Sequence, residues 1–129
     1  MDRRRFGQLG EAFAARYLWK HGYQVLMQNY KCRFGEIDLV AAKRKKVVFV
    51  EVKTRRPDST ALPKEAVDLN KQHRILAAAV TLLKLEEFAK YQPRFDVIEV
   101  TMEYDSQYKK AKINHIKDAF EAEMTNVFI

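Results

Sequence analysis

The segment from Val47 to Lys53 combines the pattern of a buried strand with two side chains that can do chemistry. Successive residues of a strand point to opposite faces, so Glu51 and Lys53 share one face with Phe49. A carboxylate that is partly buried beside apolar side chains is costly unless it is paired or binds a ligand. We therefore take Glu51 and Lys53 as candidate catalytic residues.

A preceding segment, residues 36–42, brings more charge to the same place if the two segments form a hairpin. Whether the turn holds two residues or four, the numbers of directly opposed residues sum to 89. Asp38 then lies opposite Glu51, and Glu36 lies opposite Lys53. Opposed residues share a face, with their Cβ atoms roughly 4.5 to 5.5 Å apart. The hairpin therefore predicts a cluster of carboxylates and an ammonium group.

Two opposed carboxylates repel each other unless a cation lies between them. A hard divalent ion suits such oxygen ligands, so Mg²⁺, or Mn²⁺ in its place, is the expected cofactor. The ion would activate a bound water and hold phosphate oxygens, while Lys53 would stabilise the charge on the phosphate or orient the attacking water. This chemistry is hydrolysis of a phosphodiester. The alternative is the solvated face of an edge strand, with Lys53 paired to Glu36 or Glu51.

The elements that must position these residues follow from the hydrophobic pattern. Apolar residues at helical spacing predict a first helix that runs to Lys20 and stops at His21 and Gly22. A second helix is expected from Pro63 to about Lys84, and a short third helix at 118–124. Strands are expected at residues 23–30, 36–42, 47–53, 95–100 and 111–116.

The connections between these elements predict an α/β fold. The first three strands are joined by short connections and should form an antiparallel meander, whereas a helix joins the third strand to a parallel fourth. The result is a mixed sheet flanked by helices, in a single domain that spans residues 1–129. The predicted buried face of the second helix comprises Leu69, His73, Leu76, Val80 and Leu83.

The formal net charge of +7 is unevenly placed, because residues 43–56 alone carry +6. Such a concentration attracts a polyanion such as nucleic acid, although a solvated lysine-rich turn is the alternative. Without base-reading signatures, the basic runs are expected to contact the phosphate backbone. These runs are Arg3-Arg4-Arg5, Lys43-Arg44-Lys45-Lys46 and Arg55-Arg56.

Cysteine and histidine usage excludes other classes of site. One cysteine, Cys32, cannot form a disulfide within the chain, and three separated histidines do not supply a zinc site. His73 is expected in the core, and His21 and His115 are expected to lack a catalytic partner. No apolar run approaches the roughly 18 residues that span a bilayer, so we expect a cytoplasmic protein that does not insert into membranes.

Four stretches carry a joint pattern, namely GQLGE at 7–11, GEIDLV at 35–40, FVEVKTR at 49–55 and RFDV at 94–97. Together, and in this order, they resemble the YraN-like family of predicted endonucleases. That family is placed in the PD-(D/E)XK superfamily, alongside archaeal Holliday-junction resolvases. The joint occurrence of GEID and FVEVKTR is specific, whereas a lone Glu-x-Lys would mean little.

The resemblance implies a restriction-endonuclease-like fold with an α-β-β-β-α-β core. The superfamily's Asp, Glu and Lys match Asp38, Glu51 and Lys53, which are the residues that the hairpin register also brings together. The acid of the family's first helix matches Glu11, which in related resolvases helps to hold the metal or its water. The alternative for Glu11 is an ordinary exposed glutamate on a helix.

Supporting roles are expected for Glu36, Lys71 and Gln72. Glu36 follows from the hairpin register. Lys71 and Gln72 lie where related enzymes place a supporting polar residue on the helix after the Glu-x-Lys strand. A solvated helix face explains these two residues equally well.

The resemblance and the predicted cluster together imply a Mg²⁺-dependent endonuclease that acts on DNA. Analogy with resolvases extends this expectation to branched or structured DNA and to a homodimer that presents two sites to two strands. Two other classes stay open. A nucleic-acid-binding or adaptor module would keep this fold without cutting, and a hydrolase of small phosphoesters would show little dependence on salt.

Overall fold

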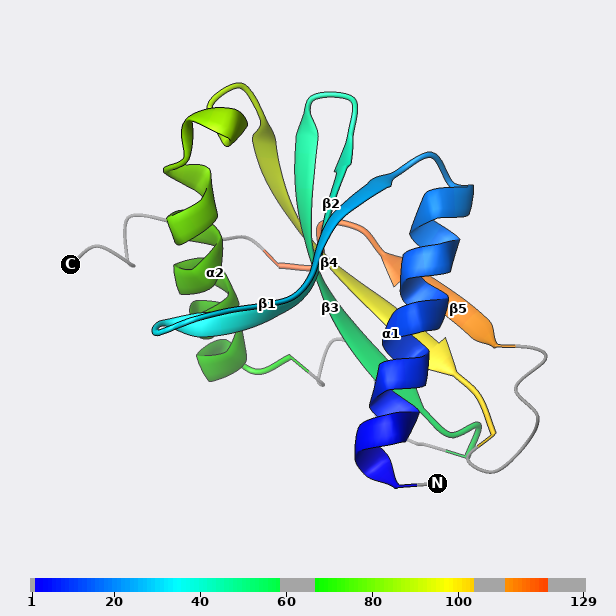
Figure 1. Cartoon of the computed structure of the whole chain (residues 1–129). Coiled ribbons are helices and arrows are strands. Elements are labelled where there is room, and N and C mark those ends of the chain that lie inside the picture. Colours follow the sequence, from blue (N-terminus) through cyan, green and yellow to red (C-terminus); the bar gives the residue numbers. More distant parts are fainter. Residues whose placement is uncertain (1, 59–66, 104–110, 121–129) are drawn as a thin grey trace.

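The computed structural model describes residues 2–58, 67–103 and 111–120, in which helices flank a sheet (Figure 1). The elements are α1 (Arg3–Lys20), β1 (Gln24–Cys32), β2 (Gly35–Lys43), β3 (Lys46–Arg55), α2 (Leu69–Leu83), the short 3₁₀ helix η2 (Glu86–Phe88), β4 (Gln92–Thr101) and β5 (Lys112–Ile116). This order confirms the predicted succession of helices and strands. Pro63, the predicted start of the second helix, lies outside the described residues. So does most of the expected third helix, and its described part, 118–120, is not helical.

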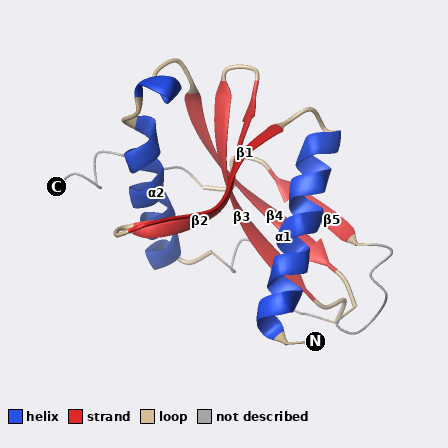
Figure 2. Ribbon diagram, in the orientation of Figure 1, coloured by secondary structure: helices blue, strands red, loops and turns tan. Residues whose placement is uncertain are grey.

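The five strands form one mixed sheet in the order β1-β2-β3-β4-β5. β1, β2 and β3 are antiparallel neighbours, β4 is parallel to β3, and β5 is antiparallel to β4. α1 covers one face of the sheet and α2 covers the other (Figure 2). The predicted α/β architecture, with a meander followed by a parallel strand, is therefore confirmed.

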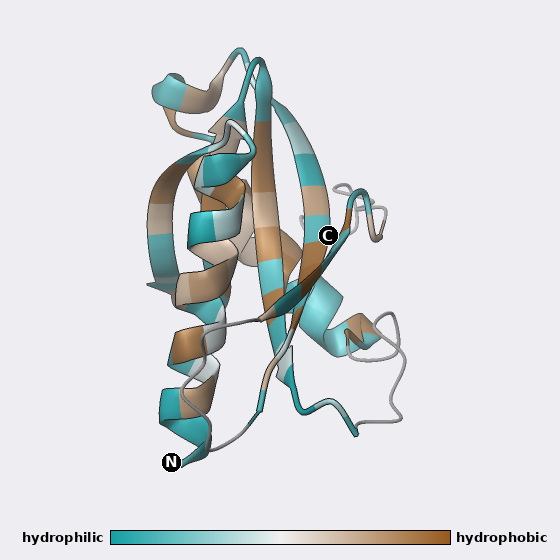
Figure 3. Cartoon of the chain, turned by 90° about the vertical axis from the view of Figure 1, so that its right-hand side faces the viewer, coloured by the Kyte–Doolittle hydropathy of each residue, from teal (hydrophilic) through white to brown (hydrophobic). Residues whose placement is uncertain are grey.

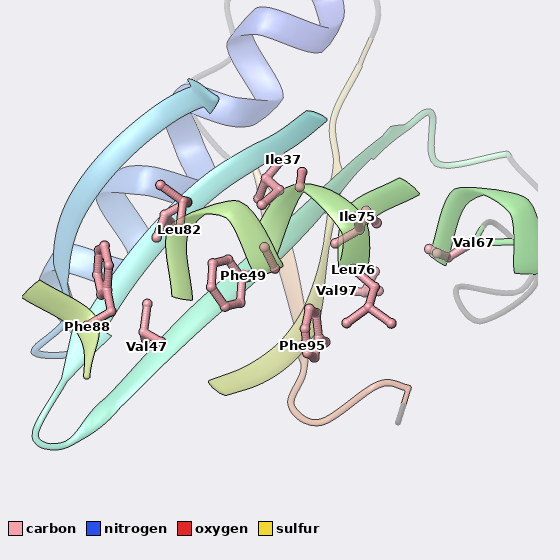
Figure 4. Close-up of a cluster of buried hydrophobic side chains, with 13 residues drawn as sticks. Ile37, Val47, Phe49, Val67, Ile75, Leu76, Leu82, Phe88, Phe95 and Val97 are labelled. Atoms are coloured by element: carbon pink, nitrogen blue, oxygen red, sulfur yellow. The ribbon is translucent and has the colours of Figure 1, made fainter. Parts of the chain in front are cut away.

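β3 contributes to both layers of the core because its side chains alternate between the two faces. Val48, Val50 and Val52 pack in the α1-side layer, and Val47 and Phe49 pack in the α2-side layer. Figure 4 shows the α2-side layer, where the rings of Phe49 and Phe95 stack with their centroids 5.3 Å apart. Polar and apolar residues alternate along α1 in Figure 3, as expected for a helix with one face on a sheet.

The hairpin of β1 and β2 crosses from the α1 side to the α2 side because its alternation breaks half-way along. Asn29 has a φ of 54°, in the left-handed region that asparagine tolerates better than most residues. The register of β1 and β2 skips the pair Asn29–Asp38. Ile37 and Leu39 would share a face in a regular strand, yet Ile37 packs in the α2-side layer and Leu39 in the α1-side layer. The tip of the hairpin consequently lies beside α2 (Figure 1).

The tip of this hairpin meets α2 at Gly35. A Cβ atom at Gly35 would overlap the carbonyl oxygen of Arg74, so a side chain there would push the two backbones apart. Further along the hairpin, the hydroxyl of Tyr30 lies 2.5 Å from the hydroxyl of Thr81 on α2. These contacts hold β2 against α2 and fix how closely side chains of the two elements approach.

The buried face of α2 matches the predicted one only in part, since Leu76 and Val80 are buried as predicted. His73 is exposed and Leu69 is 70% exposed, so the expectation of a core histidine is wrong. The buried residues are Ile75, Leu76, Ala78, Ala79, Val80 and Leu82. The sequence of α2 fits two overlapping apolar stripes, the predicted one and one that contains Ala78 and Ala79. The stripe with the alanines faces the sheet, because small side chains let α2 approach β2 as closely as it does at Gly35.

A fully buried carboxylate, Asp96, joins β4 to β5 and α1. It accepts hydrogen bonds from Arg94 at 2.8 and 2.9 Å and from the N–H of Asp118 at 2.9 Å. His115 Nε2 lies 2.7 Å from Asp96, and His115 Nδ1 lies 3.1 Å from the hydroxyl of Tyr17. Burial alone would raise the pKa of Asp96, but the hydrogen bonds from His115 and Arg94 outweigh it and lower that pKa. His115 was expected to lack a catalytic partner, and the structure gives it Asp96 and Tyr17 as hydrogen-bond partners away from the predicted carboxylate cluster.

We expect Gly35→Ala to lower the free energy of unfolding by about 1–3 kcal/mol, because the new methyl group meets backbone that cannot rotate away. Gly7→Ala is the matched control, since nothing lies within 4 Å of a Cβ at that helical position. Alanine should leave α1 unchanged or slightly stabilised. Urea denaturation of the two variants checks this, and equal midpoints would show that α2 does not need the close approach at Gly35.

Candidate active site

β2 and β3 part at Asp38, and the candidate site occupies the fork between them. The ladder of these strands ends at the pair Leu39–Val50, and its register confirms the predicted sum of 89. Beyond that pair, Oδ2 of Asp38 accepts a hydrogen bond from the N–H of Val52 at 2.8 Å. A side chain of β2 therefore anchors β3 at the point where the backbone of β2 turns toward α2.

Glu51 lies in this fork with only 4% of its surface exposed, and it contacts Asp38. Burial is the main reason why the pKa of Glu51 rises to about 8, and the hydrogen bond and charge of Asp38 raise it further. With its pKa near 8, Glu51 keeps its proton at neutral pH, and a hydrogen bond joins its side chain to that of Asp38. The two carboxylates converge as the hairpin register predicted.

Two ammonium groups approach the same oxygen of Glu51. Nζ of Lys53 lies 3.7 Å and Nζ of Lys71 lies 3.5 Å from Oε2. Lys71 is in the first turn of α2, where its N–H donates to the capping carboxylate of Asp68 at 2.8 Å. Its Nζ also lies 3.7 Å from Glu36 Oε1. The predicted pairing of Glu36 with Lys53 is not formed, because β2 has already left β3 at that residue.

Glu11 reaches the same region from α1. Burial raises the pKa of Glu11, the charge of Asp38 raises it further, and a hydrogen bond with the Asn29 side chain opposes the rise. Asn29, the left-handed residue of β1, thus also holds the carboxyl group of Glu11 within electrostatic range of Asp38. Glu11 is half-buried and is not the ordinary exposed glutamate of the alternative.

A hollow of about 580 Å³ opens beside the fork, between the first half of α1 and the end of β3. Lys53 and Glu11 line this hollow, which we call the fork hollow, together with Arg3, Arg55 and Arg56. The guanidinium of Arg55 is mostly buried and pairs with Glu99 of β4. Arg3, Lys53 and Arg56 therefore supply accessible positive charge beside the carboxylates, although Asp58 lines the same hollow and lies 3.8 Å from Nε of Arg56.

Other predicted residues do not join this cluster. The turn residues Lys43–Lys46 lie at the opposite end of β3 from the fork (Figure 1) and line a second hollow. The side-chain amide of Gln72 donates to the carbonyl of Val67 at 3.0 Å, so it supports the start of α2 and not the carboxylates.

Asp38 and Glu51 form a donor set that suits Mg²⁺ or Mn²⁺. The ion typically keeps several waters and binds through one or two carboxylates, which is what the fork offers. Within residues 2–58, 67–103 and 111–120, no three His, Cys, Asp or Glu side chains gather as a metal-binding group. A metal at the fork would therefore depend on Asp38 and Glu51, and it would displace the proton of Glu51.

Comparison with known proteins identifies the family. Residues 10–100 match the uncharacterised protein family UPF0102. This chain belongs to UPF0102. The match spans every residue placed at the fork, and it confirms the YraN-like family that the four sequence motifs predicted.

Individual relatives of this UPF0102 chain match nearly end to end. A UPF0102 protein of Caldanaerobacter subterraneus subsp. tengcongensis is 45% identical over 120 residues, 93% of this chain and 98% of its own. One from Syntrophus aciditrophicus is 46% identical over 117 residues, 91% of this chain and 89% of its own. Among solved structures, Pyrococcus furiosus SfsA in complex with Ca²⁺ aligns with 90% of this chain and 64% of its own, at 14% identity. Its TM-score of 0.36 is too low to carry an argument.

The sequence predicted a protein that does not insert into membranes. In the described part of this UPF0102 chain, neither long helix has the length and apolar character that a membrane span requires. The cytoplasmic location stays a prediction.

The raised pKa of Glu51 predicts how stability depends on pH. Between about pH 4.5 and 8 the folded protein keeps a proton on Glu51 that the unfolded chain releases, so the free energy of unfolding falls as pH rises through this window. Glu51→Gln removes this pH-dependent contribution to the free energy of unfolding. The difference in stability between wild type and Glu51→Gln should change by up to about 1.4 kcal/mol per pH unit in metal-free buffer. Urea titrations at several pH values check this, and a constant difference would contradict it.

Proposed function

We propose that this UPF0102 chain is a Mg²⁺-dependent endonuclease that hydrolyses phosphodiester bonds in DNA, with a restriction-endonuclease-like fold of the PD-(D/E)XK superfamily. One observation carries the proposal: the buried Glu51 is hydrogen-bonded to Asp38 in the fork, with two lysines at the same oxygen of Glu51. Burying one acid beside a second, half-buried acid is destabilising, and neighbouring cations only partly offset this cost. Binding of a divalent cation by the two carboxyl groups would explain why this arrangement is present.

Asp38 and Glu51 are the residues that would hold the ion, and Glu11 lies close enough to influence it through its charge. When bound, Mg²⁺ or Mn²⁺ supplies Lewis-acid activation of water and of a phosphate oxygen. The hydrogen bond from Val52 orients the carboxylate of Asp38 before any ligand arrives. Such preorganisation lowers the cost of assembling the site during the reaction.

Lys53 and Lys71 have different surroundings, which supports different roles. Lys53 lines the fork hollow, where its ammonium would stabilise negative charge on a phosphate or orient the attacking water. Lys71 lies between Glu36 and Glu51 and neutralises acidic side chains from the α2 side. We therefore propose Lys53 as a catalytic residue and Lys71 as a positioning residue.

The charge around the fork hollow supports a polyanionic substrate. Arg3, Lys53 and Arg56 line it, and long basic side chains of this kind contact backbone phosphates without reading bases. Branched DNA and a homodimer remain part of the proposal by analogy with resolvases. The order α-β-β-β-α-β supports the restriction-endonuclease-like assignment.

A nucleic-acid-binding module without catalysis is the second candidate. One observation favours it: in the part of the chain that the structure describes, the acids of the fork do not form a group of three potential metal ligands. Such a module would bind DNA through the same basic surface and would leave it intact.

We expect purified protein with Mg²⁺ or Mn²⁺ to cut at least one of four labelled DNA substrates, namely single-stranded, duplex, flap and four-way DNA. Asp38→Asn keeps the size of the side chain and an oxygen for the Val52 N–H, but it weakens the donor set for the ion. Cleavage should fall at least about a hundredfold in this variant. Gel assays with and without EDTA measure the effect.

The control for this experiment is Glu87→Gln, which removes one carboxylate from an exposed position in η2. It should cut as fast as wild type. Cleavage that persists in Asp38→Asn would indicate a contaminating nuclease and would contradict the assignment of the fork as the active site. Binding with no cleavage under any metal condition would favour the non-catalytic module.

Metal binding should release a proton, because Glu51 is protonated below about pH 8 and must lose this proton to act as a ligand. The apparent affinity for Mn²⁺ should rise up to about tenfold per pH unit between pH 6 and 8. Titration calorimetry in two buffers with different ionisation enthalpies measures the released proton. If no proton is released, Glu51 is not the ligand.

A further inference from the structure

The second hollow lies at the opposite end of β3 from the fork and measures about 500 Å³. We call it the turn hollow. Its charged lining residues are all basic, with no Asp or Glu among the described residues that line it. They are Lys43, Arg44, Lys45 and Lys46 of the β2–β3 turn, Arg94 of β4, and Lys117, which follows β5. An anion is the ligand that this lining would attract.

The fold holds parts of this lining in place. The guanidinium of Arg94 donates to Asp96 through Nε and Nη2 and to the hydroxyl of Tyr23 at 2.8 Å. Nζ of Lys43 donates to the carbonyl of His21 at 2.8 Å and lies 5.0 Å from the centre of the Tyr23 ring. The turn hollow is therefore built on side chains with fixed partners, unlike a freely solvated lysine-rich turn.

The turn itself is also fixed to the sheet. Arg44 has a φ of 57°, and the carbonyl of Lys45 accepts a hydrogen bond from the N–H of Gln92 at 2.8 Å. Lys46 and Lys117 are exposed at the rim and are available to a ligand. The hollow thus combines a fixed floor with exposed ammonium groups, an arrangement that suits a phosphate on a larger molecule.

Both hollows open on the α1 side of the sheet. The turn hollow is lined by Tyr23 and the fork hollow by Phe6 and Val52, and all three residues pack in the α1-side layer. Alternation places Lys46 and Val52 on the same, α1-side face of β3, and Val52 lines the fork hollow. Six strand steps separate these two residues, which corresponds to roughly 20 Å at about 3.3 Å per residue. A duplex rises about 3.4 Å per base pair, so roughly six base pairs cover this distance.

We propose that the turn hollow binds a backbone phosphate of the same DNA whose other phosphate lies in the fork hollow, roughly six base pairs away. The identity of this ligand rests on the proposed function. The turn hollow makes no contact with the reacting phosphate. It holds the duplex in register along the α1 side, so DNA that is too short to span the two hollows loses this contact.

The test measures DNA binding in EDTA, so that no cleavage is needed. The probe is a fluorescent duplex stem of about sixteen base pairs, closed by a non-nucleotide linker and titrated at several salt concentrations. Lys46→Gln and Lys117→Gln each remove one charge from the rim. Each should weaken binding several-fold at low salt and reduce the slope of log affinity against log salt by about one.

Lys112→Gln is the matched control, because Lys112 is an exposed lysine at the other end of β5 and lines neither hollow. Its neighbour Ile113 packs in the α1-side layer, so alternation directs Lys112 to the opposite face. It should bind DNA as wild type does. The proposal is overturned if Lys46→Gln and Lys117→Gln behave like this control, or if no variant binds the duplex at all.

A second stem, of about four base pairs, tests the span. The rim substitutions should have no effect on its affinity, because a short duplex held at the fork does not reach the turn hollow. Equal sensitivity of the two stems would overturn the spanning arrangement. If the rim substitutions weaken DNA binding but the DNA is never cut, the nuclease proposal is rejected and this inference stands. If the protein cuts DNA and the rim substitutions have no effect on binding, the nuclease proposal stands and this inference is rejected.

Discussion

The separation of β2 from β3 at Asp38 is the constraint on which the rest of the site depends. Beyond the last paired residues, the N–H of Val52 needs an acceptor, and the carboxylate of Asp38 supplies it. The same side chain is hydrogen-bonded to Glu51, so one residue both anchors the strand and orients its acidic neighbour. β2 can then lean toward α2, which brings Glu36 to Lys71. Asp38 therefore determines both the path of the β2 backbone and the position of the acidic side chains.

Charge compensation explains why such a costly fork is tolerated. Glu51 is buried and protonated, so it avoids the full penalty of a buried anion. Lys53 and Lys71 approach it from two elements and keep the site near neutrality without forming close ion pairs, since both lie 3.5 Å or more from its oxygen. Deprotonation would change the local charge by one unit.

Local patterns predicted the elements, the sheet and the hairpin register, because alternation and short turns leave few arrangements for strands 36–42 and 47–53. They failed where the backbone departs from regularity. β2 leaves β3 beyond the pair Leu39–Val50, so Glu36 does not lie opposite Lys53, and the regular alternation of residues 36–42 did not indicate this separation. The face of α2 was misjudged because two apolar stripes fit its sequence, and only contact with Gly35 selects one. The partners of His115 are distant in sequence and could not be found from spacing.

The link between Tyr17 and His115 also bears on the order in which the molecule assembles. These residues are 98 positions apart, and the bond between them ties the first helix to the last described strand. During synthesis the residues of the fork, from Glu11 to Lys71, leave the ribosome well before His115 does. Contacts of such long sequence separation form slowly, because a large loop must close first. The residues of the fork can therefore come together before β5 is synthesised. Until then, the end of α1 that carries Tyr17 lacks its hydrogen bond to His115.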